Sequence, residues 1–478
     1  MKTIHMMIGI PGSGKTTFVK KLVSEKGYDV VSTDIVRANH PQMDEKDVWP
    51  TVYKMIGDIL LEKDNCIFDA TNTTKKVRDR FKENVNLYIK DYQIYGYYFP
   101  TNYKECMRRV EKRNTQKGEL YLPVDVIKSY GENIYPPTYE ESFTNSFVMT
   151  QKPNLLKGLI DDAYQGYGFY FKSENEEVEE YSGFADINTC EAIRENTNFR
   201  LASVTKQFIA YAIMTLVEKN KISLEDTLYD IFPNMPEYTK EITIKNLLNH
   251  TSGLLDYEDM PHYEETDENY KQISDEEVLE FVRNTDRQYF KTGEKYQYSN
   301  TAYVLLGLII QKVANERLEE YLRKEVFEKN GLLNTKLNLE KITVIKPRAY
   351  GHIEQNGKLI LKDQYWCSAT LGDGGIYSSI PDLKKWLKVI ENLKEPYSQM
   401  IKAHTINGIS IEYGLGLRVK KLGDMDLIYH CGDTIGTNTI IGYVKKNEKI
   451  KYEFILLTNK GGKDTAILIE NLKKELGL

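Results

Sequence analysis

The sequence has few cysteines, no long apolar run and no strong excess of either charge, and each shortage excludes a class of protein. Its five cysteines lack Cys-x-x-Cys spacing, which argues against a disulfide framework and against a zinc site. The longest apolar stretch lies near residue 305 and is far shorter than the ~18 residues that a membrane helix needs. The first apolar stretch meets a glycine-rich loop at once, where a signal peptide would show a small-residue cleavage site. We therefore expect a cytoplasmic protein with no membrane partner.

The formal charge is only −6, from 64 basic and 70 acidic residues. A nucleic acid would therefore be bound by a local group of basic residues and not by the electrostatic field of the whole protein. Hydrophobic residues make up 41% of the 478 positions, so packed domains are possible. At the usual ~150 residues per domain, the length suggests two or three of them.

The order of predicted elements indicates two domains of different fold class. In residues 1–145, short apolar strands alternate with amphipathic helices, which predicts an α/β domain with a parallel sheet. Residues 146–158 are expected to form a linker. In residues 159–478, long helices and late strands predict an α+β domain, with an antiparallel sheet and a helical subdomain. The predicted strands are 4–8, 29–32, 66–68, 93–99, 427–430, 439–444 and 452–457, and the two long helices are 205–219 and 301–315.

A phosphate-binding pattern opens the first domain. Residues 9–16 fit GxxxxGK[ST] and lie between a predicted strand and a predicted helix. Glycines in such a loop let backbone N–H groups surround phosphates, with a helix N-terminus behind them. Lys15 would bring a positive charge to the β- and γ-phosphates, and the Thr16 hydroxyl would ligate Mg²⁺. The predicted nucleotide-binding residues of the loop are Gly9, Gly12, Ser13, Gly14, Lys15, Thr16 and Thr17.

Further polar residues are spaced as phosphoryl transfer requires. Asp34 and Arg37 stand three apart at a predicted helix start, so their side chains would share a face. Asp34 would accept the proton of an attacking hydroxyl and Arg37 would grip a phosphate, unless the aspartate only caps the helix. Asp69 ends the third strand, where a carboxylate would hold Mg²⁺ through water. Arg109 and Arg113 share a predicted lid helix and would neutralise the transferred phosphoryl group.

Residues 1–140 resemble the kinase domain of polynucleotide 5′-kinases and related AAA-type and zeta-toxin-like small P-loop kinases. The resemblance rests on the GxxxxGKT loop, the Asp34-x-x-Arg37 pair, the turn that begins at Asp69 and the arginine-bearing helix. It implies ATP and Mg²⁺ as cofactors, transfer of the γ-phosphate to a hydroxyl, and Asp34 as general base. The acceptor would be the 5′-OH of a nucleic acid or a small-molecule hydroxyl, because small-molecule kinases share this loop and lid.

The second domain contains a Ser-x-x-Lys pattern, Ser203 and Lys206, at the start of a predicted apolar helix. A spacing of three places the two side chains on one helix face. A lysine desolvated there can lose its charge and take the serine proton, and the helix N-terminus favours the developing negative charge. The pattern alone is not specific for a catalytic pair, because a serine that caps a helix and a lysine on the helix surface have the same sequence pattern.

Companion motifs make the pattern specific. Tyr298-Ser299-Asn300 precedes another apolar helix, and His430-Cys431-Gly432 ends a late strand. A glycine-rich segment, residues 372–378 with Asp373 as its second residue, lies between them. With this ordered set, residues 155–478 resemble the class C β-lactamase and DD-peptidase family of serine hydrolases, which includes esterases and D-aminopeptidases. The resemblance implies hydrolysis of an ester or amide substrate with no cofactor in this domain.

The resemblance also implies roles for individual residues. Ser203 would be the nucleophile, and Lys206 and Tyr298 would share general-base and general-acid duty. Asn300 would bind the substrate amide. The backbone N–H groups of Ser203 and Asp433 would form the oxyanion hole.

One motif departs from the pattern of many β-lactamases, which carry Lys-Thr-Gly where this chain has His430, Cys431 and Gly432. In those enzymes the positive charge of the lysine binds the substrate carboxylate. A histidine is mostly neutral at pH 7 and does not supply that charge. Strong β-lactam turnover is therefore not expected, although ester or amide hydrolysis survives the change. His250, in the sequence His-Thr-Ser-Gly-Leu, is expected to be structural.

The leading hypothesis is a bifunctional enzyme in which an ATP-dependent kinase is fused to a serine hydrolase. An alternative is a small-molecule kinase whose substrate, a metabolite or an antibiotic, is shared with the hydrolase. A further alternative makes one half a module that senses a ligand without turning it over.

Overall fold

The computed structural model describes residues 1–100, 102–116, 121–260, 271–339 and 343–478. The chain forms two compact units, one of residues 1–167 and 179–194 and one of residues 168–178 and 195–478. Within the described ranges, none of the helices combines the length and the apolarity needed to cross a membrane.

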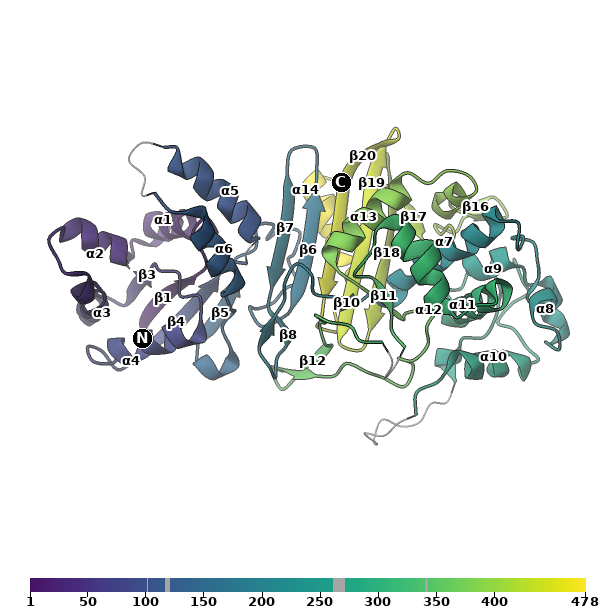
Figure 1. Ribbon diagram of the computed structural model, residues 1–478, viewed down its shortest axis with the longest axis horizontal. Helices are drawn as coiled ribbons and strands as arrows, with labels where there is room; N and C mark the ends of the chain where they lie inside the picture. Colours follow the sequence, from purple (N-terminus) through teal and green to yellow (C-terminus); the bar gives the residue numbers. More distant parts are fainter. Residues whose placement is uncertain (101, 117–120, 261–270, 340–342) are drawn as a thin grey trace. The chain divides into compact units, whose positions relative to one another are not determined.

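The first unit contains the parallel sheet that the strand–helix alternation predicts (Figure 1). Its strands lie in the order β2-β3-β1-β4-β5, and each neighbouring pair is parallel. The central strand β1 is buried at every position after its first, as expected of a strand covered on both faces. The strands are β1 (Lys2–Ile8), β2 (Asp29–Val31), β3 (Asn65–Phe68), β4 (Tyr92–Tyr98) and β5 (Asn145–Val148).

Helices cover both faces of this sheet, which confirms the predicted α/β class. Met7 on one face of β1 packs with Val19 of α1. Ile4 and Met6 on the opposite face share a cluster with residues of α3 and α4. The helices are α1 (Lys15–Lys26), α2 (Thr33–Asn39), α3 (Glu45–Glu62), α4 (Lys75–Val85), α5 (Tyr103–Asn114) and α6 (Val124–Glu132).

The segment expected to link the domains lies within the first unit. Its first residues belong to β5, which pairs with β4, and Phe147 stacks on Tyr97 with ring centroids 5.2 Å apart. Leu155 and Leu156 are buried. The boundary expected at residue 145 therefore differs from the structure, because a four-residue edge strand with two polar positions has too little hydrophobic pattern to be told from a loop.

The second unit contains the expected antiparallel sheet, so the α+β class is also confirmed. Its six strands lie in the order β17-β18-β19-β20-β6-β7, and β17 to β20 run antiparallel in chain order. These strands are β6 (Tyr167–Lys172), β7 (Glu177–Ser182), β17 (Arg418–Leu422), β18 (Met425–Thr434), β19 (Thr437–Lys446) and β20 (Lys449–Thr458). The smaller sheets of this unit are β10 (Phe199–Arg200) with β14 (Ile376–Ser378) and β11 (Lys336–Leu337), β12 (His352–Gln355) with β13 (Lys358–Leu361), and β15 (Thr405–Ile406) with β16 (Ile409–Ser410). The pair β8 (Phe184–Asp186) and β9 (Glu191–Ala192), together with residues 179–182 of β7, belongs to the first unit.

The helical part of the second unit includes the two long helices that the sequence predicts. The ring of Phe208 on α7 stacks on Trp386 of α13, with centroids 4.2 Å apart, and both side chains are fully buried. Ala302 to Ile310 of α11 are buried almost throughout, which holds its first turn in place. The helices are α7 (Thr205–Glu218), α8 (Leu228–Ile231), α9 (Ile244–Leu248), α10 (Asp275–Arg283), α11 (Asn300–Ala314), α12 (Leu318–Tyr321), α13 (Ile380–Glu391) and α14 (Ile467–Leu476).

Candidate functional site

The loop between β1 and α1 has the backbone that phosphate binding requires. Gly12 and Gly14 have φ angles of +83° and +103°, a region that favours glycine. A Cβ on Gly12 would lie 2.8 Å from the carbonyl oxygen of Cys106, so glycine also lets α5 approach the loop. The predicted residues Gly9, Gly12, Ser13, Gly14, Lys15, Thr16 and Thr17 all lie on this loop or in the first turn of α1.

Polar side chains around the loop are buried before any nucleotide is bound. The Lys15 ammonium donates to the carbonyl oxygen of Ile10 at 2.9 Å, and burial lowers its pKa to about 8 against the opposing effect of the Asp69 carboxylate. Ser13 Oγ and Arg113 Nε are buried without a partner among the described residues. Buried donors without partners are rare, and an anion at the loop would satisfy them.

Arg109 of α5 forms a hydrogen bond to the phosphate-binding loop. Its Nε donates to Glu105 at 2.8 Å, while its two terminal nitrogens donate to Gly12 O at 3.3 Å and to Gln151 Oε1 at 2.9 Å. The Arg113 charge lowers the pKa of Lys15, so this arginine also lies close to the loop. The structure therefore brings both predicted lid arginines to the phosphate loop. Gln151 was missed because an isolated glutamine in an expected linker carries no motif.

The acidic residues expected around a phosphoryl acceptor also lie close together. Asp34 and Arg37 share a face of α2, with Oδ1 and Nη1 3.2 Å apart, and Arg37 Nε donates to Glu45 at 3.2 Å. Asp69 directly follows β3. Burial raises the pKa of Asp69, the Lys15 charge opposes that rise and the Asp34 charge adds to it. Lys15 and Asp34 therefore each act electrostatically on Asp69.

Thr16 and Asp69 are the residues that would hold Mg²⁺. The described part of the chain has no group of three or more His, Cys, Asp or Glu side chains placed to bind a metal. Magnesium usually takes only one or two protein ligands and completes its shell with water and substrate phosphates. One hydroxyl and one carboxylate beside a phosphate loop fit that donor set.

Ser203 and Lys206 lie together at the start of α7. Lys206 is fully buried, and its Nζ donates to Ser203 Oγ at 2.9 Å, to Asn300 Oδ1 at 2.7 Å and to the carbonyl oxygen of Asp373 at 3.0 Å. These three acceptors use all three N–H groups of the ammonium. The pairing that the Ser-x-x-Lys spacing predicts is therefore present in the structure.

The backbone that carries Ser203 is strained and closely packed. Ala202 has a φ of +48°, which is costly for a residue with a side chain and is found mostly at functional sites. The Thr439 hydroxyl donates to the carbonyl oxygen of Leu201 at 2.8 Å, which ties this turn to β19. A Cβ on Gly432 of β18 would lie 2.1 Å from the same carbonyl oxygen, so only glycine fits.

We expect Gly432→Ala to destabilise the second unit by about 1–3 kcal/mol, because the added methyl group forces the Ser203 turn away from β18. Chemical unfolding measures this loss, and labelling of Ser203 by a fluorophosphonate should slow in parallel. Gly374→Ala is the matched control, since its Cβ would meet its nearest neighbour, Ala202 Cα, at an ordinary 3.6 Å. Equal stability of the two variants would contradict the steric argument.

The aromatic ring of Tyr298 lies close to the Lys206 ammonium group. Lys206 Nζ lies 4.9 Å from the Tyr298 ring centroid, within cation–π range. Tyr298 also contacts His250, with ring centroids 4.3 Å apart. His250 Nδ1 accepts a hydrogen bond from the Ser299 N–H at 3.1 Å, and burial lowers the pKa of this histidine well below its usual value. His250 therefore supports the Tyr298–Asn300 turn as a neutral ring.

His430 is neutral and its tautomer follows from its partners. Nδ1 lies 2.6 Å from the carbonyl oxygen of Cys431, which can only accept, so Nδ1 carries the proton. Nε2 then accepts from the Tyr413 hydroxyl at 2.9 Å. Burial lowers the pKa of His430 well below its usual value, and the charges of Arg418 and Lys206 act in the same direction. The cation at this motif in many β-lactamases is therefore missing here.

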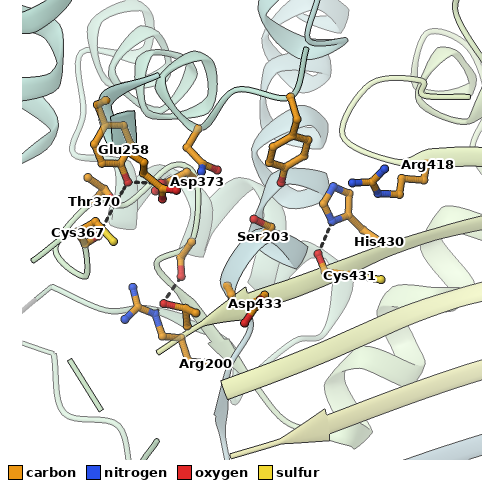
Figure 2. A pocket seen from close by; sticks show the side chains of 16 residues that line it. Arg200, Ser203, Glu258, Cys367, Thr370, Asp373, Arg418, His430, Cys431 and Asp433 are labelled. Atoms are coloured by element: carbon orange, nitrogen blue, oxygen red, sulfur yellow. Dashed lines mark hydrogen bonds between the residues drawn. The ribbon is translucent and has the colours of Figure 1, made fainter. Parts of the chain in front are cut away.

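These residues line a cavity of about 380 Å³ in the second unit, with Ser203 at its centre (Figure 2). Arg418 and His430 lie on one side of Ser203, and Glu258, Asp373 and Cys367 lie on the other. Sequence reasoning missed Arg418 and Glu258, and it included Asp373 in a motif, residues 372–378, without giving it a role. Only Arg418 had a usable signal, a basic residue at the start of the strand that pairs with the His-Cys-Gly strand.

Two family models match the chain in the places where the two sites lie. The model described as Beta-lactamase matches residues 163–475, and the model described as AAA domain matches residues 4–137. Fold and sites thus define a P-loop AAA-type domain followed by a serine hydrolase domain of the β-lactamase and penicillin-binding-protein type. Because the β-lactamase match spans more than half of the sequence, the chain belongs to the beta-lactamase family.

Two curated relatives each match somewhat more than half of the chain. Penicillin-binding protein 4* of Bacillus subtilis (strain 168) is 27% identical over 299 residues, which are 58% of this chain and 64% of that protein. Protein flp of Staphylococcus aureus (strain MRSA252) is 23% identical, over 62% of this chain and 59% of its own length. The chain thus spans less than two thirds of these curated relatives.

Solved structures share the fold of about two thirds of the chain. The octameric penicillin-binding protein homologue from Pyrococcus abyssi is 26% identical with a TM-score of 0.56, covering 65% of this chain and 73% of that one. D-amino acid amidase from Ochrobactrum anthropi SV3, complexed with D-phenylalanine, is 23% identical with a TM-score of 0.56, covering 69% and 98%. The second likeness concerns the fold alone.

Proposed function

We propose that the protein is bifunctional. Its second unit hydrolyses an ester or amide through an acyl-enzyme on Ser203, and its first unit transfers the γ-phosphoryl group of ATP to a hydroxyl. One observation carries the hydrolase proposal: a fully buried Lys206 ammonium lies 2.9 Å from Ser203 Oγ in a cavity that opens around the serine. Membership of the beta-lactamase family supports it.

In the proposed hydrolysis, Ser203 Oγ attacks the substrate carbonyl carbon and its proton passes to Lys206 or Tyr298. Transfer to Lys206 requires the neutral amine, which keeps only two N–H groups, so one of its three donated hydrogen bonds must open first. Transfer to Tyr298 instead requires its phenolate. The backbone N–H groups of Ser203 and Asp433 donate hydrogen bonds to the developing oxyanion. The leaving group departs with the proton, and water then attacks the acyl carbon and releases the acid and free Ser203.

The neutral state of His430 argues against a β-lactam as the preferred substrate. His430 is neutral and donates only to a backbone carbonyl, so it offers no cation to a carboxylate. Arg418 is the guanidinium on that side of the cavity, and it packs over the rings of Tyr298 and Tyr413 at 5.7 and 6.0 Å. We expect hydrolysis of simple esters to exceed that of benzylpenicillin, measured as kcat/KM on the full chain.

In the proposed phosphoryl transfer, the loop amides and Lys15 bind the β- and γ-phosphates of ATP. Arg109 and Arg113 neutralise charge on the transferred group, and Asp34 accepts the proton of the attacking hydroxyl. Mg²⁺ held by Thr16 and Asp69 would supply further charge neutralisation at the phosphates. Ser13 Oγ and Arg113 Nε, buried donors with no partner in the described part of the chain, are the observation that favours an anion here.

The acceptor is tested by incubating the full chain with γ-labelled ATP and an oligonucleotide that carries a 5′-OH. The same oligonucleotide with a 5′-phosphate is the control. Label on the 5′-OH strand alone supports a polynucleotide kinase. Label on a small-molecule hydroxyl in a metabolite mixture supports the small-molecule alternative, and no transfer to either contradicts kinase activity.

A further inference from the structure

Arg109 of α5 has a hydrogen-bond partner that lies beyond the residues matched by the AAA model. The match ends at residue 137, whereas Gln151 Oε1 accepts a hydrogen bond from Arg109 Nη2 at 2.9 Å. With the bonds to Glu105 and to the carbonyl oxygen of Gly12, this bond uses three of the five N–H groups of the guanidinium. Within the described residues, one N–H group on each terminal nitrogen is left for a phosphate oxygen.

The position of Gln151 depends in turn on Glu180 of β7. Gln151 lies in an irregular segment after β5, and its backbone N–H donates to the Glu180 carboxylate. Glu180 is fully buried, and its carboxylate also accepts from the hydroxyl of Tyr167 at 3.2 Å and from the side chain of Thr150. Three donors therefore hold this carboxylate in place, and Gln151 connects it with Arg109.

Glu180 also acts on Arg109 through its charge. Burial raises the pKa of Glu180 to about 7, and the Arg109 charge opposes that rise. The guanidinium therefore lies within electrostatic reach of a buried carboxylate, and the attraction favours the position in which Arg109 contacts Gln151. All of these residues belong to the first compact unit.

The contact with Gln151 fixes a side chain that would otherwise be mobile. Glu105, the other side-chain partner of Arg109, also pairs with the exposed Arg108 and is therefore shared between two guanidinium groups. A mobile arginine must be ordered before it can stabilise charge on a transferred phosphoryl group. Contacts that are formed before the substrates bind remove this cost.

We propose that Gln151, anchored by Glu180, is a positioning residue for phosphoryl transfer, which holds the Arg109 guanidinium at the phosphate-binding loop, where it stabilises charge on the γ-phosphoryl group. The inference rests on the proposed kinase activity. Gln151 and Glu180 act through Arg109 and not on the substrates directly. The kinase unit then depends on two residues outside the AAA match, one of which, Glu180, lies within the residues that the beta-lactamase model matches.

The test is a double-mutant cycle on the full chain, with γ-labelled ATP and the 5′-OH oligonucleotide as acceptor. Gln151→Ala should lower kcat about 10-fold, the lower end of the cost of losing a hydrogen bond to a charged group, with little change in KM for ATP. In the Arg109→Ala background, where the guanidinium is absent, Gln151→Ala should have no further effect. Glu180→Ala should follow Gln151→Ala in both backgrounds. Gln151→Glu keeps an acceptor for Arg109 and should retain most of the transfer.

Gln93→Ala is the matched control, because Gln93 Nε2 donates to Thr3 Oγ1 at 2.9 Å at the end of β1 farthest from the phosphate-binding loop. It should keep the wild-type kcat. An equal fall in kcat for Gln151→Ala in both Arg109 backgrounds overturns the inference, as does wild-type transfer by Gln151→Ala, or a Gln151→Glu variant as slow as Gln151→Ala.

The same cycle separates failure of the inference from failure of the proposed kinase. Should the wild-type chain label a small-molecule hydroxyl in place of the oligonucleotide, that compound serves as the acceptor for all variants. If the wild-type chain labels neither, the proposed kinase fails and the inference fails with it. If the wild-type chain transfers label and the losses in Gln151→Ala and Arg109→Ala simply multiply, the kinase stands and Gln151 does not act through Arg109.

Discussion

Ser203→Ala should lower kcat/KM for ester hydrolysis by at least about 10³-fold, since removal of a nucleophile leaves only the contribution of binding and of the oxyanion donors. The substitution removes the atom that Lys206 Nζ contacts at 2.9 Å and leaves the other two acceptors of Lys206 in place. The fold should therefore persist while acylation stops. The measurements are steady-state hydrolysis of 4-nitrophenyl acetate and intact mass after treatment with a fluorophosphonate.

The exposed Ser410 of β16 provides the matched control, because it has the same chemistry without a buried lysine beside it. Ser410→Ala should keep both activity and labelling. A fluorophosphonate adduct that persists in Ser203→Ala, or that maps to another residue, would show that the nucleophile is assigned incorrectly. Labelling of wild-type Ser203 without turnover of any ester or amide would instead indicate a sensing module.

The features that the sequence predicted are those encoded locally. The alternation around β1 to β4, the loop at Gly12 to Lys15 and the Ser203–Lys206 spacing each depend on a few neighbouring residues, and each appears in the structure as expected. Hydrophobic periodicity and helix geometry are sufficient for such predictions.

The features that the sequence did not predict depend on contacts between distant segments. Glu258 and Asp373 are 115 positions apart and meet only because the chain returns to the N-terminus of α11. Arg418 approaches Tyr298 through the pairing of β17 with β18. The neutral state of His430 also required the structure, because it follows from a backbone carbonyl and a tyrosine hydroxyl that no motif contains.

Lys15→Ala should lower the rate of phosphoryl transfer from ATP by about 10²–10³-fold, the usual cost of removing one group that stabilises transition-state charge. Lys15 is the buried cation of the loop and lies within electrostatic reach of Asp69 and Arg113. Without it, the loop amides still face the phosphates but the charge on the transferred group is less well neutralised. Transfer of label from γ-labelled ATP measures the loss, and ester hydrolysis by the same sample should be unchanged.

Lys20→Ala is the matched control, because Lys20 lies on the same helix with its side chain exposed. It should retain transfer. Loss of transfer in both variants would indicate damage to α1 in general, and undiminished transfer in Lys15→Ala would mean that the loop does not bind the reacting phosphates. A simultaneous loss of ester hydrolysis in Lys15→Ala would contradict independent function of the two units, because Lys15 and Ser203 belong to separately packed parts of the chain.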